Sequence, residues 1–237
     1  MMRVAVLVPA YQAALHLPGV LKRLAALERR PETLVVDDGS SDGTGDVARG
    51  AGARVLTFPE NRGKGNALIA GFRALAEFDA VITLDADGQH PPECVPAFVA
   101  AAEGGADLVL GARERSGDMP VLRRFANGFS SGWASWLAGQ RVSDSQCGYR
   151  LYGRRLLERT PITPGRYEVE SEVIVRAARL GFRLAEVPIP TVYGTEKSQI
   201  SATRDVPRIV GVLGRLTLEW VVPPPAMRQA ARQEVGS

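Results

Sequence analysis

Apolar residues in the first half of the chain fall into short continuous runs separated by segments with helical spacing. The runs predict strands at residues 4–8, 33–37, 54–58, 80–84 and 106–113. Between the third and fourth runs, Leu68, Phe72 and Leu75 recur at the spacing of one helix face. Continuously apolar strands that alternate with helices are typical of a mostly parallel sheet covered on both faces. The pattern therefore predicts an α/β fold with such a sheet at its centre.

The second half of the chain is less regular and continues the same unit. Helices are expected at residues 121–139, 168–181 and 204–220, and a strand at 182–189. No linker or internal repeat divides the sequence. We expect a single domain over residues 1–220, with halves at about 1–113 and 114–220, followed by a flexible tail at 221–237.

Two of these helices carry large apolar side chains on one face. In the first helix they are Phe125, Phe129, Trp133 and Trp136, which we expect in the core or on a helix-packing face. In the last helix they are Ile209, Leu213, Leu216 and Trp220. We expect this amphipathic helix to pack on its own domain. The alternative is that it contacts a membrane surface or a membrane partner subunit.

Composition and charge argue against several classes of protein. The net charge of +3 over 237 residues is too small to indicate nucleic-acid binding. Cys94 and Cys147 lack CxxC spacing, so neither a zinc site nor a disulfide is predicted. No apolar stretch reaches the roughly 20 residues that cross a bilayer, and the N-terminal run is too short for a signal peptide. We expect a cytoplasmic protein, soluble or peripheral at the cytoplasmic membrane face.

Polar and charged residues follow several of the predicted strands directly. Pro9-Ala10-Tyr11 follows the first strand, Asp37-Asp38 the second, Asp85-Ala86-Asp87 the fourth, and Arg113 the fifth. Parallel α/β sheets bind ligands at the carboxyl ends of their strands. The convergence of these segments at one edge predicts a ligand site there.

The Asp85-Ala86-Asp87 segment is the sharpest single signal. Residues two apart in an extended segment point the same way, so both carboxylates can share a hard divalent cation. Gln89 adds a neutral oxygen, and oxygen ligands favour Mg²⁺ or Mn²⁺ over zinc. The alternative interpretation is a solvated turn, since paired aspartates are common. His90 is expected to orient this loop without ligating.

The segment NRGKGNA at residues 61–67 is a glycine-rich turn that opens a helix. It lacks the GxxxxGK[ST] spacing of a Walker A loop and is not a GxGxxG motif after the first strand. Gly63 and Gly65 are expected to form the tight turn. Lys64 either contacts an anion of the ligand or only decorates the helix start.

Seven ordered motifs carry a resemblance to a known family: VAVLVPAY, VVDDGSSDGT, NRGKGNAL, LDADGQHPPE, LVLGAR, SDSQCGYRLY and YGTEKSQIS. Together they resemble family 2 glycosyltransferases with the Rossmann-like GT-A fold, in particular the dolichyl-phosphate mannose synthase-like branch of polyprenyl-phosphate sugar synthases. The resemblance spans residues 3 to about 204. It implies a nucleotide-binding half at 1–113 and an acceptor half at 114–220.

The resemblance implies a nucleotide-sugar site in the first half. Pro9, Ala10 and Tyr11 would cradle the base, and Asp38 would contact the base or ribose. Many relatives carry an acidic residue shortly after the tyrosine. Here Gln12 stands in that region, which leaves one nucleotide contact and the identity of the base open.

The resemblance also implies the groups that handle phosphate charge. Asp85, Asp87 and Gln89 would hold the Mg²⁺ or Mn²⁺ that bridges the donor diphosphate, and Lys64 would lie on the donor side of the site. Arg113 would face phosphate charge from donor or acceptor. Lys197 lies in a loop that would close over the donor phosphates as a lid.

The activity implied is metal-dependent, inverting transfer of a hexose from a GDP- or UDP-sugar to a polyprenyl phosphate. A lipid phosphate is already an anion near pH 7 and needs no strong base. A hydroxyl acceptor would need one. The candidate bases are Asp144, Glu168 and Glu170, whose alternative roles are a turn residue and a helix-start charge pair.

Other functions remain as alternatives. In one alternative, the enzyme acts on a soluble saccharide or other hydroxyl acceptor. In another, the chain is a non-catalytic scaffold subunit that binds a sugar nucleotide. A nucleotidyltransferase is disfavoured because no GGxGxR loop follows the first strand, and the lack of QxxRW argues against a processive polysaccharide synthase. Arg123, Arg124 and Arg150 either bind an acceptor phosphate or are solvated surface residues.

Overall fold

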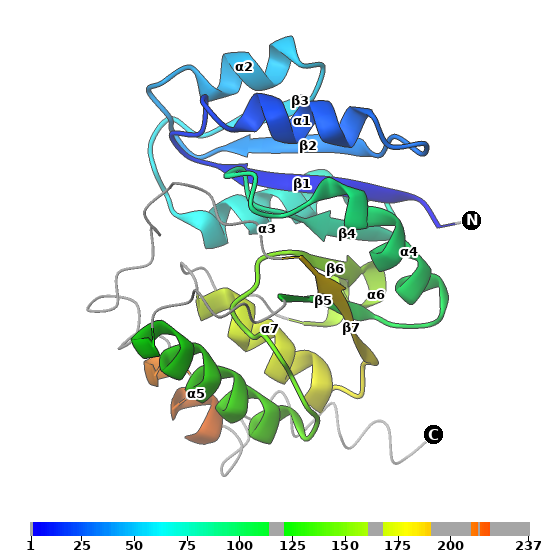
Figure 1. Ribbon diagram of the computed structural model, residues 1–237, viewed down its shortest axis with the longest axis vertical. Coiled ribbons are helices and arrows are strands. Elements are labelled where there is room, and N and C mark those ends of the chain that lie inside the picture. Colours follow the sequence, from blue (N-terminus) through cyan, green and yellow to red (C-terminus); the bar gives the residue numbers. More distant parts are fainter. Residues whose placement is uncertain (1, 114–120, 161–167, 191–209, 213, 219–237) are drawn as a thin grey trace.

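The computed structural model describes residues 2–113, 121–160, 168–190, 210–212 and 214–218 (Figure 1). Its strands are β1 (Val4–Ala10), β2 (Glu32–Asp37), β3 (Arg54–Thr57), β4 (Ala80–Thr83), β5 (Leu108–Arg113), β6 (Arg150–Gly153) and β7 (Leu184–Ile189). Its helices are α1 (Leu17–Ala25), α2 (Thr44–Gly50), α3 (Lys64–Ala74), the 3₁₀ turn η1 (Pro92–Cys94), α4 (Val95–Glu103), α5 (Val121–Ala138), α6 (Arg154–Arg159) and α7 (Glu168–Arg179).

The strands form one sheet in the order β3-β2-β1-β4-β6-β5-β7. β6 runs antiparallel to its neighbours β4 and β5, and the other adjacent strands are parallel. The predicted α/β fold with a mostly parallel central sheet is therefore confirmed. Residues 150–153 form a short strand inserted between two parallel neighbours, an insertion that the sequence analysis did not predict.

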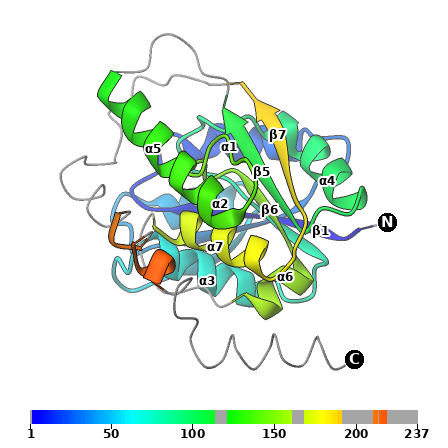
Figure 2. The same ribbon diagram turned by 90° about the horizontal axis from the view of Figure 1, so that it is seen from below.

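Helices cover both faces of the sheet because each central strand buries side chains on both sides. On β1, Val6 and Val8 belong to the apolar cluster under α1 and α4, whereas Ala5 and Leu7 belong to the cluster under α3, α6 and α7. Figure 2 shows these two groups of helices on opposite sides of the strands. The period of two along a strand produces this division.

A smaller third cluster joins α5 to α7 and to the helical residues 214–218. Leu137, Val175 and Leu216 are its buried members, and Trp133 packs against them. Burying a leucine completely stabilises a fold by about 1.5–3 kcal/mol. The expectation that the last helix packs on its own domain is thus met at Leu216.

The expectation for the aromatic face of α5 is only partly right. Trp133 is half-buried, but Phe129 is 53% exposed and Trp136 is 58% exposed. α5 instead buries Ala134 and Leu137, which lie on its α7-facing side. The side chain of Phe125 lies outside the described part of the chain. Within the described residues, no helix combines the length and the apolar character that a membrane span requires.

Candidate active site

The carboxyl ends of the parallel strands bring the predicted polar segments to one edge of the sheet. Ala10 at the end of β1 pairs with Asp37 at the end of β2, and the Asp38 amide donates to the Ala10 carbonyl at 2.8 Å. β4 ends at Thr83, two residues before Asp85, and lies next to β1. The nucleotide-site and metal-site segments therefore start from neighbouring strands.

The loop after β1 is held in place by side chains from the turn after β2. The amide of Gln12 donates to Ser40 Oγ at 3.0 Å, and Gln12 Nε2 donates to Ser41 Oγ at 3.0 Å. Gln12 has φ of 51°, a conformation that costs a non-glycine residue energy and that these bonds support. The Ala13 amide donates to Thr44 Oγ1 at 2.8 Å. We had not predicted these contacts, although the SSDGT turn is rich in the side chains that make them.

Pro9, Ala10 and Tyr11 lie together at this edge, with the Tyr11 side chain exposed. Asp38 is buried, and its carboxylate accepts the amides of Arg62 at 2.7 Å and Gly63 at 2.8 Å. In this structure Asp38 thus orders the turn that opens α3. The nucleotide-binding role expected for it remains a prediction.

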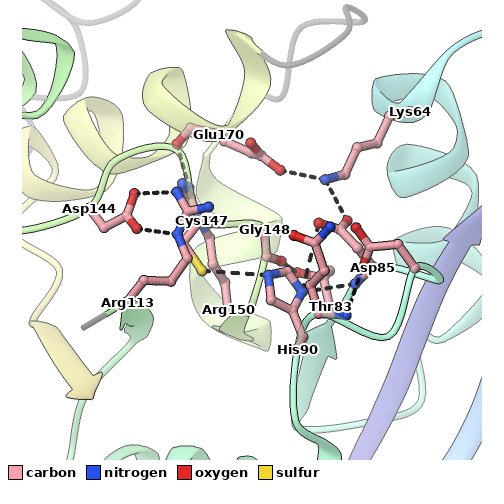
Figure 3. A network of polar contacts seen from close by, with 12 residues as sticks. Lys64, Thr83, Asp85, His90, Arg113, Asp144, Cys147, Gly148, Arg150 and Glu170 are labelled. Atoms are coloured by element: carbon pink, nitrogen blue, oxygen red, sulfur yellow. Dashed lines mark hydrogen bonds and ion pairs between the residues drawn. The ribbon is translucent and has the colours of Figure 1, made fainter. Parts of the chain in front are cut away.

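Lys64 lies between two carboxylates at the first position of α3 (Figure 3). Its Nζ is 2.7 Å from Asp85 Oδ1 and 2.8 Å from Glu170 Oε1, which comes from α7. The Glu170 side chain is 4% exposed and that of Asp85 30%, so solvent reaches this trio from the Asp85 side. The two roles expected for Lys64, contact with an anion of the ligand or a position at the helix start, do not include its ion pair with Glu170.

The charges of this trio support one another. Burial opposes the charged form of Lys64, but Asp85 and Glu170 outweigh it and raise the Lys64 pKa. Burial would raise the pKa of Asp85, but Lys64 and His90 lower it to about 2. Lys64 is therefore an ammonium ion and Asp85 a carboxylate over the whole neutral range.

Of Asp85 and Asp87, Asp87 is the carboxylate whose negative charge is less neutralised by nearby cations. Its Oδ1 accepts the Gln89 amide at 2.9 Å, while burial and the charge of Asp85 raise its pKa. His90 Nδ1 accepts the Asp85 amide at 3.1 Å, and burial lowers the pKa of His90. A neutral His90 thus orients the Asp85 backbone, which is the role expected for it.

Asp85 and Asp87 fit a divalent cation for which the protein would supply only some of the ligands. A carboxylate whose pKa is raised by a neighbouring carboxylate gains from a nearby cation. Yet no group of three or more His, Cys, Asp and Glu side chains gathers around a metal-sized position in the described part of the chain. Asp85 and Asp87 would bind Mg²⁺ or Mn²⁺ together with oxygens from a ligand, with Gln89 close by.

Gly148 closes the site from the side of β6. The Thr83 hydroxyl donates to the Gly148 carbonyl at 2.7 Å. A Cβ at this glycine would lie 2.8 Å from Lys64 Nζ and 2.9 Å from Asp85 Oδ2. Only a residue without a side chain therefore lets the Lys64–Asp85 ion pair form where it does.

Arg113 and Asp144 form a second charged pair at the end of β5. Arg113 Nε and Nη2 donate to the two Asp144 oxygens at 2.6 and 3.1 Å. Burial opposes the charge of Arg113, but its hydrogen bonds with Asp144 raise the Arg113 pKa above its ordinary value. Asp144 also accepts the Gln146 amide at 3.1 Å. A carboxylate held by a bidentate arginine is poorly placed to act as a general base.

Arg150 fits neither alternative expected from the sequence, because it is not a solvated surface residue and its donors are taken up by backbone carbonyls instead of being open to an acceptor phosphate. Its side chain is fully buried and donates to the carbonyls of Ser145, at 2.8 Å, Cys147, at 2.7 Å, and Glu170. It fixes the loop before β6 to the start of α7. The side chains of Arg123 and Arg124 lie outside the described part of the chain.

The structure thus brings together Lys64, Asp85, His90 and Glu170 and places the Arg113–Asp144 pair near them (Figure 3). Asp87 and Gln89 follow in the loop after Asp85 and are joined by a hydrogen bond. Lys197 and its loop, and the side chain of Glu168, lie outside the described residues. Their expected roles remain predictions.

Comparison with known proteins identifies the family. A profile described as "Glycosyl transferase family 2" matches residues 5–163. An undecaprenyl-phosphate mannosyltransferase of Micrococcus luteus is 36% identical over 205 residues, covering 81% of this chain and 84% of the relative. A polyprenol monophosphomannose synthase of Mycolicibacterium smegmatis is 31% identical over 202 residues, covering 79% and 76%. The chain belongs to glycosyltransferase family 2 and is a glycosyltransferase.

Solved structures confirm the fold. Glucosyl-3-phosphoglycerate synthase of Mycobacterium tuberculosis, solved with Mn²⁺, UDP and glucosyl-3-phosphoglycerate, superposes with a TM-score of 0.76. It is 23% identical, and the match covers 91% of this chain and 80% of that one. The shared architecture is the GT-A fold that the sequence motifs imply.

Proposed function

We propose that this glycosyltransferase moves a hexose from a GDP- or UDP-sugar to the phosphate of a polyprenyl phosphate, with inversion at the sugar carbon. Mg²⁺ or Mn²⁺ at Asp85 and Asp87 would assist. The relatives support the acceptor class, since their names specify undecaprenyl and polyprenol carriers. A third, from Haloferax volcanii, is a dolichyl-phosphate hexose transferase, 35% identical over 188 residues.

The main support for a phosphate acceptor is that the two candidate bases whose side chains are described, Asp144 and Glu170, already form ion pairs with basic side chains. Asp144 is paired with Arg113, and Glu170 is paired with Lys64. A hydroxyl acceptor needs a base to take its proton, whereas a lipid phosphate with a second pKa of about 6 is already charged at neutral pH. The site therefore suits an acceptor that arrives as an anion.

The remaining groups fit the departure of a nucleotide diphosphate. Breaking the sugar–phosphate bond leaves negative charge on the diphosphate, and a divalent cation bound there would stabilise it. Asp85 and Asp87 would position that cation at the end of β4. Lys197 would approach the diphosphate from its loop, and Arg113 would face the phosphate of the acceptor. The Pro9–Tyr11 segment would hold the base.

A lipid acceptor also implies where the enzyme works. We expect it at the cytoplasmic face of a membrane, where a polyprenyl phosphate presents its head group. The exposed aromatic residues Phe129 and Trp136 on α5 suit contact with a lipid surface or a membrane partner subunit. The transfer assay below does not depend on this placement.

The test is a transfer assay with matched acceptors. The purified protein is given GDP-mannose or UDP-glucose with Mn²⁺, and then a short polyprenyl phosphate or the corresponding unphosphorylated polyprenol. Nucleotide release that depends on both the cation and the phosphorylated lipid is the expected result. Metal-dependent donor binding with no response to the lipid phosphate would overturn the acceptor assignment and favour a soluble hydroxyl acceptor.

Asp87→Asn tests the metal assignment in the same assay. We expect turnover to fall by about 10²-fold or more, because an interaction that stabilises a leaving group contributes several kcal/mol in the transition state. The matched control is Asp46→Asn on α2, whose side chain is 86% exposed and pairs with Arg49. If Asp87→Asn turns over as fast as the control variant, the metal site is elsewhere.

A further inference from the structure

The ammonium group of Lys64 lies between the Asp85 and Glu170 carboxylates. Lys64 comes from the nucleotide half, Glu170 comes from the acceptor half, and Asp85 lies between them at the end of β4. The absence of a side chain at Gly148 leaves the space that the ammonium and the Asp85 carboxylate fill. The ion pair between Lys64 and Asp85 therefore depends on the glycine before β6 as well as on the charges.

Lys64 and a divalent cation compete for the same carboxylate. Asp85 Oδ1 is 2.7 Å from Lys64 Nζ, a direct charge-assisted contact. An ion bound by Asp85 and Asp87 would lie a few ångströms from this ammonium and be repelled by it. With Lys64 in place, part of the negative charge of Asp85 is neutralised, so the two aspartates attract an ion less strongly. The charge of Lys64 should therefore weaken metal binding to the protein without nucleotide.

Glu170 gives Lys64 a second partner that the metal does not need. Its carboxylate is 2.8 Å from Lys64 Nζ and almost fully buried, so it stays paired whether or not Asp85 is released. A nucleotide diphosphate would bring new negative charge to Asp85 and Asp87. It would favour the divalent cation at Asp85 and leave Lys64 with Glu170.

We propose that Lys64 is an internal counter-cation that makes divalent-metal binding conditional on the nucleotide. Without nucleotide, Lys64 neutralises Asp85 and disfavours the metal. With nucleotide, the metal takes its place on Asp85 while Glu170 retains the lysine. This inference rests on the proposed function, because it uses the metal and donor assigned there, and it gives Lys64 a role in controlling the order of assembly.

Mn²⁺ binding, measured by electron paramagnetic resonance without any transfer reaction, tests the proposal. For the wild type we expect affinity for Mn²⁺ alone to be at least about tenfold weaker than with GDP or UDP. Lys64→Met should strengthen binding of Mn²⁺ alone by about tenfold or more, the scale expected for a unit charge a few ångströms from an ion. Binding of Mn²⁺ in the presence of nucleotide should change less, so the factor by which nucleotide strengthens Mn²⁺ binding should shrink. By reciprocity, the factor by which Mn²⁺ strengthens nucleotide binding should shrink equally.

A second variant predicts the opposite change. Glu170→Gln removes the buried carboxylate that shares Lys64 with Asp85, so Lys64 should stay closer to Asp85 and Mn²⁺ alone should bind more weakly than to the wild type. The matched control is Arg62→Met, which removes one positive charge from the same turn. The Arg62 guanidinium lies over the Phe58 ring at 5.2 Å, and its loss should leave Mn²⁺ affinity unchanged. Circular dichroism checks that each variant is folded.

The outcomes separate this inference from the proposed function. Equal Mn²⁺ affinity in Lys64→Met and the wild type overturns the role of Lys64 and leaves the transfer activity untouched. Weaker binding in Lys64→Met overturns it as well, because Lys64 would then support the metal. An absence of Mn²⁺ binding in every variant, with or without nucleotide, overturns both the metal assignment and this inference.

Discussion

Arg150 offers the sharpest test of what holds the site together. Its guanidinium is fully buried, and it donates to the carbonyls of Ser145, Cys147 and Glu170. Replacing it by methionine keeps a long apolar side chain but removes the three donors. We expect Arg150→Met to lower the free energy of unfolding by about 3–5 kcal/mol, as when one partner of a buried charged network is removed.

The magnitude follows from two opposing contributions. Each carbonyl that loses a charged donor costs roughly 1–3 kcal/mol, which gives an upper limit near 9 kcal/mol for three. Removing a buried guanidinium also removes its own desolvation cost, which offsets several kcal/mol. Arg150→Lys places one ammonium where a planar fork reached three carbonyls, so it should lose an intermediate amount, about 1–3 kcal/mol.

Urea unfolding at 25 °C measures these differences, with the dependence on urea concentration used to confirm that the unfolded states are comparable. The matched control is Arg73→Met, an exposed arginine on α3. Its effect should stay within about 0.5 kcal/mol. A loss below about 1 kcal/mol for Arg150→Met would refute the reasoning, because it would mean that the three carbonyls find other donors at little cost.

Two further predictions concern the Lys64–Asp85 contact. Gly148→Ala places a Cβ within 3 Å of both charged groups, so it should lower stability by about 1–3 kcal/mol in urea unfolding; an unchanged midpoint would contradict this. The folded-state pKa of Asp85 is about 2, below its ordinary 3.8, so its carboxylate adds stability above about pH 4 that is lost as the pH falls toward 2. Asp85→Asn should flatten that acid-side decline in unfolding curves at stepped pH, and an unaltered decline would contradict the ion pair.

The residues at the strand ends were predictable because they depend on local pattern. A continuous apolar run predicts a buried strand, and the polar residues that follow it must lie at the edge of the sheet. Asp85, Asp87 and Arg113 were located in this way. The order of the strands was not predictable, because periodicity says which face a side chain joins and not which strand lies beside it. The insertion of β6 between β4 and β5 is therefore found only in the structure.

The partners of the charged residues were the least predictable part of the site. Lys64 and Glu170 are 106 residues apart in the sequence, and nothing local to either one indicates the other. The bonds from the Asp38 carboxylate to the amides of Arg62 and Gly63 were likewise not indicated by the sequence. Side-chain bonds to the backbone of a distant loop follow from tertiary packing and leave no spacing signal in the sequence.

The antiparallel strand β6 fixes how far the end of β4 lies from the end of β5. Thr83 of β4 pairs with Arg150 of β6, and Leu110 of β5 pairs with the same residue. Hydrogen-bonded strands lie about 4.8 Å apart, so the ends of β4 and β5 are separated by roughly 10 Å across β6. Under the proposed function, a donor bound at Asp85 and an acceptor bound near Arg113 would lie side by side across this distance. Because the sheet fixes this spacing, the proposed exchange of the Lys64 partners would need only a side-chain movement, since Lys64 already contacts both Asp85 and Glu170.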